Sequence, residues 1–477
     1  MRLALFVFAA TVLAAAPASS QAAGARPATP DSAKKPVTYV AGALSTPNAD
    51  PFPSTYRARE SRPTVITNVT ILTGTGTRID RGTVVFMNGK ISAVGTNLPL
   101  PDGAIVIDGS GKWLTPGLID THSHLGVYSA PGVEANSDGN EATNPNTAQV
   151  WAEHSVWPQD PQFPRALAGG ITTMQILPGS ANLFGGRSVV LKNVPARSVQ
   201  EMKFPGAKYG LKMACGENPK RVYAQRGPST RMGNVAGYRA AWIAAEQYRR
   251  RWDKWLEKRD GDPPPRDLQN ETLAEVLRGN IYVQNHCYRA DEMVQMIDIA
   301  REFGYSIRSF HHGVEAYKIA DLLAKENIAG SIWSDWGGFK MEALDGVRGN
   351  LAMLDAAGAR AIVHSDDATG TQRLNQDAAK GVAAGARLGI AIAPEKAIKW
   401  ITINPAWALG LDDKIGSIEV SKNADVIVWT GNPFSVYSKP ERVWIDGALL
   451  FDRTDPKSWW KTDFELGFVP AVMGGIR

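Results

Sequence analysis

Residues 116–124 read PGLIDTHSH, an apolar run that ends in two histidines separated by one residue. In a β-strand, residues two positions apart point to the same face, so the imidazoles of His122 and His124 can bind one cation together. Two hydrogen-bonded core histidines would be the ordinary alternative for such a pair. The stretch therefore predicts a buried strand with two functional histidines at its C-terminal end.

Seven further apolar segments follow this strand, and helical patterns such as those of residues 289–304 and 314–327 separate most of them. Strands that alternate with helices imply a parallel sheet. Eight such units over roughly 300 residues are typical of a (β/α)8 TIM-like barrel with insertions, in which functional side chains sit at the C-terminal ends of the strands. The strand candidates are residues 117–124, 169–177, 186–192, 209–216, 280–287, 306–312, 328–335 and 359–366.

Short alternating strands, punctuated by Gly and Asn-Gly, lie on both sides of this region. They are typical of antiparallel hairpins, and strands from both ends of the chain could complete one small composite β-sandwich. The α/β chain accordingly comprises a leader at residues 1–23, a Pro/Ala/Ser-rich and loosely ordered arm at 24–62, sandwich strands at 63–112 and 412–455, the barrel at 113–411, and a tail at 456–477.

The composition indicates a well-packed globular protein. Of the 477 residues, 44% are hydrophobic and 21% are charged, which excludes a disordered, fibrous or multi-span membrane protein. The net charge of +5 has a local source, because residues 249–260 carry six bases against three acids. We interpret this segment as a solvated amphipathic helix rather than a surface for anions, and we expect no nucleic-acid partner.

The N-terminus has the pattern of a secretory signal peptide. Met1 and Arg2 precede an apolar run over residues 3–16, and small residues follow through Ala25. The run is shorter than the roughly 20 residues of a membrane span. We expect cleavage between residues 16 and 25, export to the periplasm or the medium, and no membrane attachment of the mature chain.

Two cysteines, Cys215 and Cys287, are present in the chain. Each sits in an apolar, strand-like segment, and we favour two buried thiols over a disulfide between them.

Six of the seven histidines lie at the ends of candidate strands: His122, His124, His286, His311, His312 and His364, with His154 as the exception. Imidazoles gathered at one barrel face point to metal coordination.

At these residues a family resemblance becomes specific. PGLIDTHSH resembles the first-strand segment of the amidohydrolase superfamily. NHCYRADEM and HHGVEAYKIA resemble the fifth- and sixth-strand segments of its imidazolonepropionase-like and prolidase-like members. VHSDD resembles the eighth-strand segment, and TINPAWALGL with GSIEVSKNADVIVW resembles the return to the sandwich. The resemblance runs from about Arg62 to Phe451 and implies a metal-dependent hydrolase of C–N bonds that acts on small molecules.

The resemblance also selects ligands. His286 is the candidate on its strand, and His312, which precedes a glycine as in the family pattern, is preferred to His311. We expect His311 to face the helices or to support a ligand. Asp366 is preferred to Asp367, which we expect to cap the next turn. His364 shares the inner face with Asp366 and is either a partner that orients this carboxylate or an ordinary buried histidine.

Two-metal members of the superfamily need an anionic bridge, usually a carboxylated Lys or a Glu. Lys212 and Glu217 are the candidates in residues 208–221, and they have opposite parity on a regular strand. We favour Glu217, which stands at the strand end before a Pro-containing loop, and keep Lys212 as the alternative.

Such a ligand set implies two divalent ions, zinc first, with manganese, iron or nickel as other fits. The ions would activate a water and polarise a carbonyl, while Asp366 accepts the water's proton and delivers it to the leaving nitrogen. A deaminase is the rival enzyme, but its family members carry His-x-x-Glu where this chain has Arg289 in place of Glu. The non-enzymatic alternative is a barrel without metals that serves as a scaffold.

The substrate is open: a dipeptide, an N-acyl amino acid or a cyclic amide. Arg289 and Arg231 could bind a substrate carboxylate through their guanidinium groups, although pairing of Arg289 with Asp291 or Glu292 and a surface position for Arg231 are the simpler expectation. Trp333 and Trp336 flank the end of the seventh strand, where we favour core packing over a pocket. A homo-oligomer is compatible with the sequence, which does not decide the oligomeric state.

Overall fold

A computed structural model of the chain describes residues 45–462. The predicted leader, residues 24–44 of the arm and residues 463–477 of the tail lie outside the described residues. The chain divides into two units, residues 1–46 and residues 47–477, and the second unit holds the helices and strands of the described residues.

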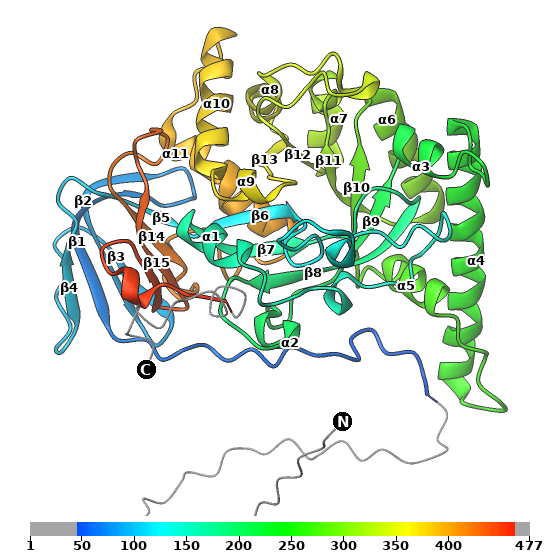
Figure 1. The fold of residues 1–477 in the computed structure, drawn as a ribbon, viewed down its shortest axis with the longest axis horizontal. Helices are drawn as coiled ribbons and strands as arrows, with labels where there is room; N and C mark the ends of the chain where they lie inside the picture. Colours follow the sequence, from blue (N-terminus) through cyan, green and yellow to red (C-terminus); the bar gives the residue numbers. More distant parts are fainter. Residues whose placement is uncertain (1–44, 463–477) are drawn as a thin grey trace, which may run out of the picture. The chain divides into compact units, whose positions relative to one another are not determined.

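The centre of this unit is a sheet of eight strands in chain order, from β6 to β13 (Figure 1). Neighbouring strands pair throughout this order, and a backbone hydrogen bond of 2.9 Å from Asp366 N to His122 O links its two ends. The sheet is therefore a nearly closed TIM-like barrel, as predicted. Its strands are β6 (Leu118–Ser123), β7 (Ile171–Ile176), β8 (Phe184–Lys192), β9 (Gly210–Ala214), β10 (Tyr282–Cys287), β11 (Ile307–His312), β12 (Ala329–Ile332) and β13 (Arg360–Val363).

The third strand departs from the predicted parallel order. β8 runs antiparallel to both β7 and β9. The reason is the short connection over residues 177–183, because a parallel connection needs a dozen or more residues and usually a helix. The expected βα alternation is thus replaced at this point by a hairpin.

Helices fill most of the other connections. The predicted pattern at residues 289–304 forms α6, which ends at Gly304, whose φ of +73° suits a glycine. The basic segment at residues 249–260 lies mostly within α4, as expected for a solvated amphipathic helix, and the apolar face of this segment buries Trp252 against Tyr248 and Ala274. The helices are α1 (Gln162–Ala168), α2 (Val199–Met202), α3 (Glu217–Val222), α4 (Arg231–Lys258), α5 (Leu268–Leu277), α6 (Ala290–Phe303), α7 (Ala320–Lys325), α8 (Asn350–Ala356), α9 (Ala368–Thr371), α10 (Leu374–Arg387), α11 (Pro394–Ala397) and α12 (Ile403–Ala408). Among the described residues, no helix combines the length and apolar character that crossing a membrane requires.

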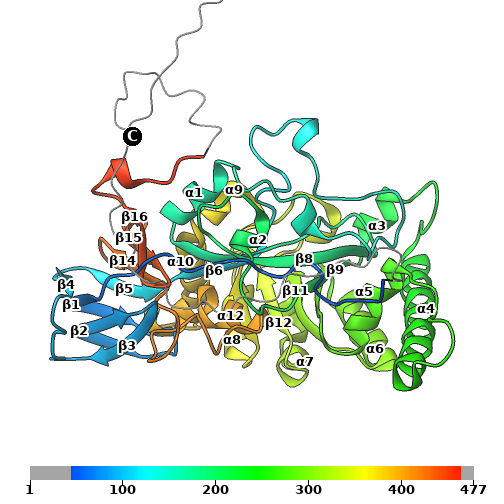
Figure 2. The same cartoon turned by 90° about the horizontal axis from the view of Figure 1, so that it is seen from below.

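Strands from both ends of the chain share a second sheet, in the order β16-β15-β14-β5-β1-β2-β3 with β4 beside β1. Figures 1 and 2 show the early strands next to β14 and β15. Their buried faces form one core with Val69, Phe86, Leu114, Val428 and Trp444. The strands are β1 (Thr64–Leu72), β2 (Arg78–Met87), β3 (Lys90–Gly95), β4 (Ile105–Asp108), β5 (Trp113–Pro116), β14 (Val426–Trp429), β15 (Pro440–Ile445) and β16 (Ala448–Asp452).

This sheet corrects one predicted assignment. The sequence pattern assigns residues 113–116 to the barrel, but as β5 they pair with β1 on one side and with β14 on the other. The backbone enters the barrel only at Leu118, after Gly117.

The last part of the arm is also more ordered than predicted, since residues 47–62 follow an extended path along the barrel. Lys203 Nζ donates to Asp50 Oδ1 at 2.8 Å and to Phe52 O at 2.7 Å, and Arg187 Nη1 donates to Ala49 O at 2.8 Å. Tyr56 hydrogen-bonds Asp446. Polar groups supplied by the barrel and the second sheet thus fix a segment that has no periodicity of its own.

Candidate metal centre

Three predicted ligands converge at the C-terminal end of the barrel. His122 Nε2 and His124 Nε2 are 3.3 Å apart, and they lie 3.2 Å and 3.1 Å from Asp366 Oδ1. Around a tetrahedral ion with bonds of about 2.1 Å, ligand atoms are about 3.4 Å apart. The three atoms therefore already have the spacing of ligands on one cation.

A hydrogen-bond chain sets the tautomer of His122. Gln284 Nε2 contacts Ala408 O at 3.3 Å, which directs Oε1 toward His311 Nε2 at 2.8 Å. A carbonyl oxygen only accepts, so His311 Nε2–H donates and its Nδ1 is left as an acceptor. His122 Nδ1, 2.9 Å from His311 Nδ1, must then be the donor. His122 Nε2 consequently presents its lone pair to the cluster, and His311 supports a ligand, one of the two roles expected for it.

The second histidine is fixed in the same way, because His124 Nδ1 donates to the backbone oxygen of Leu177 at 2.9 Å. Burial also keeps the other imidazoles neutral at pH 7, which is the form that binds metals. It lowers the pKa well below the ordinary value for His122, His286, His311 and His312.

The two remaining histidine candidates lie beside this cluster. The rings of His286 and His312 are 4.6 Å apart, and the ring of His312 is also 4.6 Å from that of His122. His312 Nδ1 is 2.9 Å from His364 Nε2, so His364 contacts a histidine rather than orienting the Asp366 carboxylate. His122, His312 and His364 form a second group whose nitrogens could hold a cation.

Asp366 combines backbone strain with a stabilised charge. Its φ is +65°, and His312 has a φ of +72°, both unusual for residues other than glycine. Burial opposes ionisation of Asp366, but His312 and His124 hold its pKa well below the ordinary value. The neighbouring Asp367 accepts from the backbone N–H groups of Thr369 and Gly370 and caps α9, as predicted.

Lys212, rather than the favoured Glu217, lies in the cluster. The Lys212 side chain is fully buried, its Nζ is 3.2 Å from His122 Nε2, and burial lowers its pKa to about 7. Glu217 begins α3 after Gly216, whose φ is +80°, and its carboxylate lies 3.7 Å from Lys340 Nζ. The sharp turn at Gly216 takes Glu217 off the line of β9. The geometry thus reverses the preference drawn from the sequence.

A buried aspartate that the sequence did not single out closes the barrel beneath these ligands. Asp120 Oδ1 accepts from the N–H groups of His122 at 3.1 Å and of Ser365 at 3.2 Å, and burial raises the pKa of Asp120 to about 6. Its place two residues before His122, on the same strand face, was the signal available in the sequence.

The cysteines correct another prediction, because Cys215 and Cys287 form a disulfide rather than two free thiols. Ala214 and His286 are partners in the parallel pairing of β9 with β10, so the next residues on the two strands face each other, with Cα atoms 5.2 Å apart. The bridge joins the ends of these strands directly after His286.

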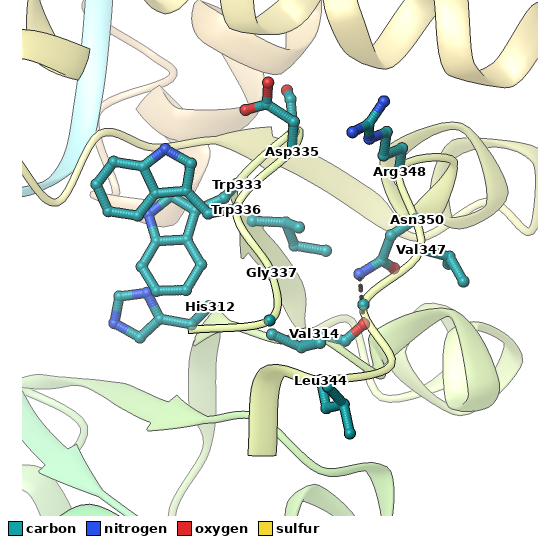
Figure 3. Close-up of a pocket in the computed structure, with 14 residues that line it drawn as sticks. His312, Val314, Trp333, Asp335, Trp336, Gly337, Leu344, Val347, Arg348 and Asn350 are labelled. Atoms are coloured by element: carbon teal, nitrogen blue, oxygen red, sulfur yellow. Dashed lines mark hydrogen bonds between the residues drawn. The ribbon is translucent and has the colours of Figure 1, made fainter. Parts of the chain in front are cut away.

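The cluster opens into a cavity of about 650 Å³. Its walls include Tyr128, Asn218, Tyr288, Trp333, Trp336 and Lys340. The indole of Trp333 stacks on His312 at 4.2 Å and on Trp336 at 5.2 Å, an arrangement that Figure 3 shows from the side of a smaller neighbouring cavity. Trp333 is buried and Trp336 is 45% exposed. Both line cavities, so the expectation of core packing was wrong for Trp336 and incomplete for Trp333.

The two arginines proposed for substrate binding point elsewhere. Arg289 donates to both oxygens of Asp291 at 2.9 Å, the simpler of its two expected roles. Arg231 begins α4 and pairs with Glu342 and, at 3.1 Å, with Glu292. Neither residue lines the cavity.

A barrel that gathers histidines and one ionised aspartate at the C-terminal ends of its strands defines the class of metal-dependent hydrolases. The family model described as "Amidohydrolase family" matches residues 113–450, and the chain belongs to this family. It is a hydrolase of C–N bonds, within a metal-dependent superfamily that acts on small molecules.

Three relatives show the extent of the similarity. The chain is 34% identical over 398 residues to the amidohydrolase tasK of Hapsidospora irregularis, covering 78% of this chain but only 40% of that protein. It is 24% identical to the imidazolonepropionase of Shewanella frigidimarina, covering 74% of this chain and 86% of that one. The crystal structure of an amidohydrolase from Thermotoga maritima superposes with a TM-score of 0.76 at 38% identity, over 82% of this chain and 100% of the other.

Proposed function

We propose that this protein is an exported amidase that hydrolyses the C–N bond of a small amide, with Asp366 as the group that transfers the proton. The substrate classes we propose are a dipeptide, an N-acyl amino acid or a cyclic amide. The observation that carries the proposal is the convergence of His122 Nε2, His124 Nε2 and Asp366 Oδ1 within 3.3 Å of one another, at the edge of a cavity large enough for such a molecule.

The residues present fit a pair of divalent cations, for which zinc is our first choice. His122 and His124 would hold one ion together with Asp366, and His286 and His312 would hold the other. A bound ion would supply the Lewis acid that polarises the scissile carbonyl and lowers the pKa of a water.

We further propose that Lys212 supplies the bridging anion. Its amine would react with carbon dioxide, forming an N–C bond and losing one proton, to give a side chain that ends in a carboxylate. The support is its position, fully buried with Nζ 3.2 Å from His122 Nε2.

Different residues would carry out proton transfer, orient the ligands and exclude water. Asp366 accepts the proton of the attacking water and donates it to the leaving nitrogen when the C–N bond breaks. His311 and Leu177 O keep His122 and His124 in the tautomers that leave Nε2 free. Trp333, stacked on His312, covers one side of the cluster and limits the access of bulk water.

The test compares variants of two adjacent aspartates, Asp366 and Asp367. Asp366→Asn should lower kcat by at least about 10³-fold while bound zinc is largely retained, because the amide keeps an oxygen ligand but cannot accept the proton. Asp367→Asn is the matched control; it should keep both metal and activity, since Asn also caps helices well. Activity retained in Asp366→Asn would remove this residue from proton transfer.

Deamination is the less favoured reaction. The position that follows His286 by three residues carries Arg289, which is held by Asp291 outside the cavity, so no acid stands there to protonate a ring. Release of ammonia from aminoazoles or nucleobases would reinstate this reaction.

Export rests on the N-terminal pattern, and the disulfide agrees with it because disulfides persist mainly in oxidising compartments. Expression of the full chain, followed by N-terminal sequencing of the product outside the cytoplasm, should place the new N-terminus between residues 17 and 25. An unprocessed chain in the cytoplasm would contradict export.

A further inference from the structure

The cavity contains one cation that the proposed reaction does not use. Besides the cluster residues, its lining includes two charged side chains, Asp335 and Lys340. Asp335 is paired with Lys380 at 3.1 Å. Lys340 is therefore the positively charged side chain that this cavity offers, among the described residues, to a bound molecule.

Neighbouring side chains hold the ammonium of Lys340 in place without taking up all of its N–H donors. Nζ donates to Asn218 Oδ1 at 3.0 Å and lies 3.7 Å from Glu217 Oε1, beyond a normal hydrogen bond. It also sits over the ring of Tyr288, 4.3 Å from the centroid. An ammonium has three N–H donors, so Nζ keeps capacity for a ligand oxygen.

Asn218 places this cation close to the reacting centre. Its Nδ2 lies 3.4 Å from His286 Nε2, while its Oδ1 accepts from Lys340. One side-chain amide thus separates the two residues, which puts Lys340 Nζ within about 9 Å of His286 Nε2. This span suits a substrate whose anionic group is a few bonds from its scissile amide.

The charges around Lys340 favour an anion of modest charge. Glu217 and Glu342, two carboxylates, and Arg221, one guanidinium, lie close enough to Lys340 to act on its charge. Glu342 is already paired with Arg231. Lys340 already forms a long ion pair with Glu217, at 3.7 Å. A carboxylate adds one negative charge beside this cation, whereas a doubly charged phosphate would meet Glu217 with less compensation.

We propose that Lys340 binds the carboxylate of the substrate, which makes an N-acyl amino acid or a dipeptide, rather than an uncharged cyclic amide, the substrate class of this cavity. The inference rests on the proposed amidase function and refines it. The rings of Trp333, Trp336 and Phe339 form the wall beside Lys340 and would contact an apolar side chain of the same molecule.

The test uses two probes that differ in one group, N-acetyl-L-phenylalanine and N-acetyl-L-phenylalaninamide. Binding is measured by calorimetry on the zinc-loaded Asp366→Asn protein, with and without Lys340→Met, so that turnover does not interfere. Hydrolysis of both probes is measured in parallel with Asp366 intact. Lys340→Arg keeps the charge, and Lys318→Met removes an exposed lysine that pairs with Glu315 outside the cavity.

Lys340→Met should raise Kd and KM for the carboxylate probe roughly 10- to 100-fold, the range for a lost hydrogen bond to a charged group, and change those for the amide less than about twofold. Lys340→Arg should restore most of the difference, and Lys318→Met should have no effect. Equal weakening of both probes, or no preference of the parent protein for the carboxylate, would overturn the proposal. If neither probe is hydrolysed while the binding difference persists, the amidase assignment fails and the carboxylate site stands.

Discussion

Removal of the disulfide tests how much of the stability comes from restriction of the unfolded chain. The perturbation is the double variant Cys215→Ala/Cys287→Ala. Both cysteines are buried, with at most 3% of their surface exposed. The bridge spans 72 residues, and for a loop of this length the chain-entropy model gives about 4 kcal/mol at 25 °C. Alanine removes little besides the bridge, so we expect the free energy of unfolding to fall by about 3–4 kcal/mol.

The assay is urea unfolding followed by circular dichroism, with excess chelator in all samples so that metal binding does not contribute. The oxidised parent protein should show no titratable thiol when denatured. Metal content and kcat of the double variant, measured separately after zinc loading, should equal those of the parent. The strand pairing and the 2.9 Å bond from Cys215 N to His286 O remain and are sufficient to hold His286.

Two outcomes would refute the reasoning. A stability loss below about 1 kcal/mol would show that the bridge does not restrict the unfolded chain as the model assumes. A loss of bound metal in the folded double variant would show that the disulfide, rather than the strand pairing, positions His286.

Three further predictions concern the cluster and the second sheet. Lys212→Met should lower the number of bound zinc ions from two to one or none, whereas Glu217→Gln should leave it unchanged; metal analysis of both variants decides, and the reverse result would restore Glu217 as the bridge. Stripping the metal with a chelator should abolish hydrolysis, lower Tm, and be reversed by zinc or manganese; a protein that purifies without metal and is not activated by either would be the scaffold. Burial beside Asp446 raises the pKa of Asp425 to about 6, so the unfolded state binds fewer protons than the folded state between pH 4 and 6, and stability must fall as the pH rises through this window. Asp425→Asn should abolish up to about 3 kcal/mol of that fall, as measured by urea unfolding at pH 4 and pH 7, and parallel pH curves for the two proteins would contradict it.

The features that the sequence could predict are those carried by local patterns. Alternating apolar segments predicted all eight barrel strands, and the spacing of His122 and His124 pointed to the cluster of residues that could bind a metal ion. The direction of β8 was missed because composition alone does not encode direction, although the short connection at residues 177–183 does. Residues 113–116 were misassigned because their partners in β14 lie more than 300 residues downstream.

The site residues that escaped prediction are defined by contacts between distant segments. Lys340 shares no motif with the histidines, and it lines the cavity from the segment that follows β12. The choice between Lys212 and Glu217 depended on the turn at Gly216, which no periodicity indicates. The pairing of Cys215 with Cys287 depended on the register between β9 and β10.

The position of β5 between β1 and β14 has a consequence for how the protein is made. While the chain is being synthesised, the apolar faces of the early strands, with Val69, Phe86 and Leu114, have no partner until Val428 and Trp444 emerge from the ribosome. The ribosome must therefore complete the whole barrel before this core can close, and the unpaired edge of β5 is open to aggregation in the meantime. The proposed export would benefit from that delay, because a sheet that cannot close early leaves the polypeptide unfolded for translocation.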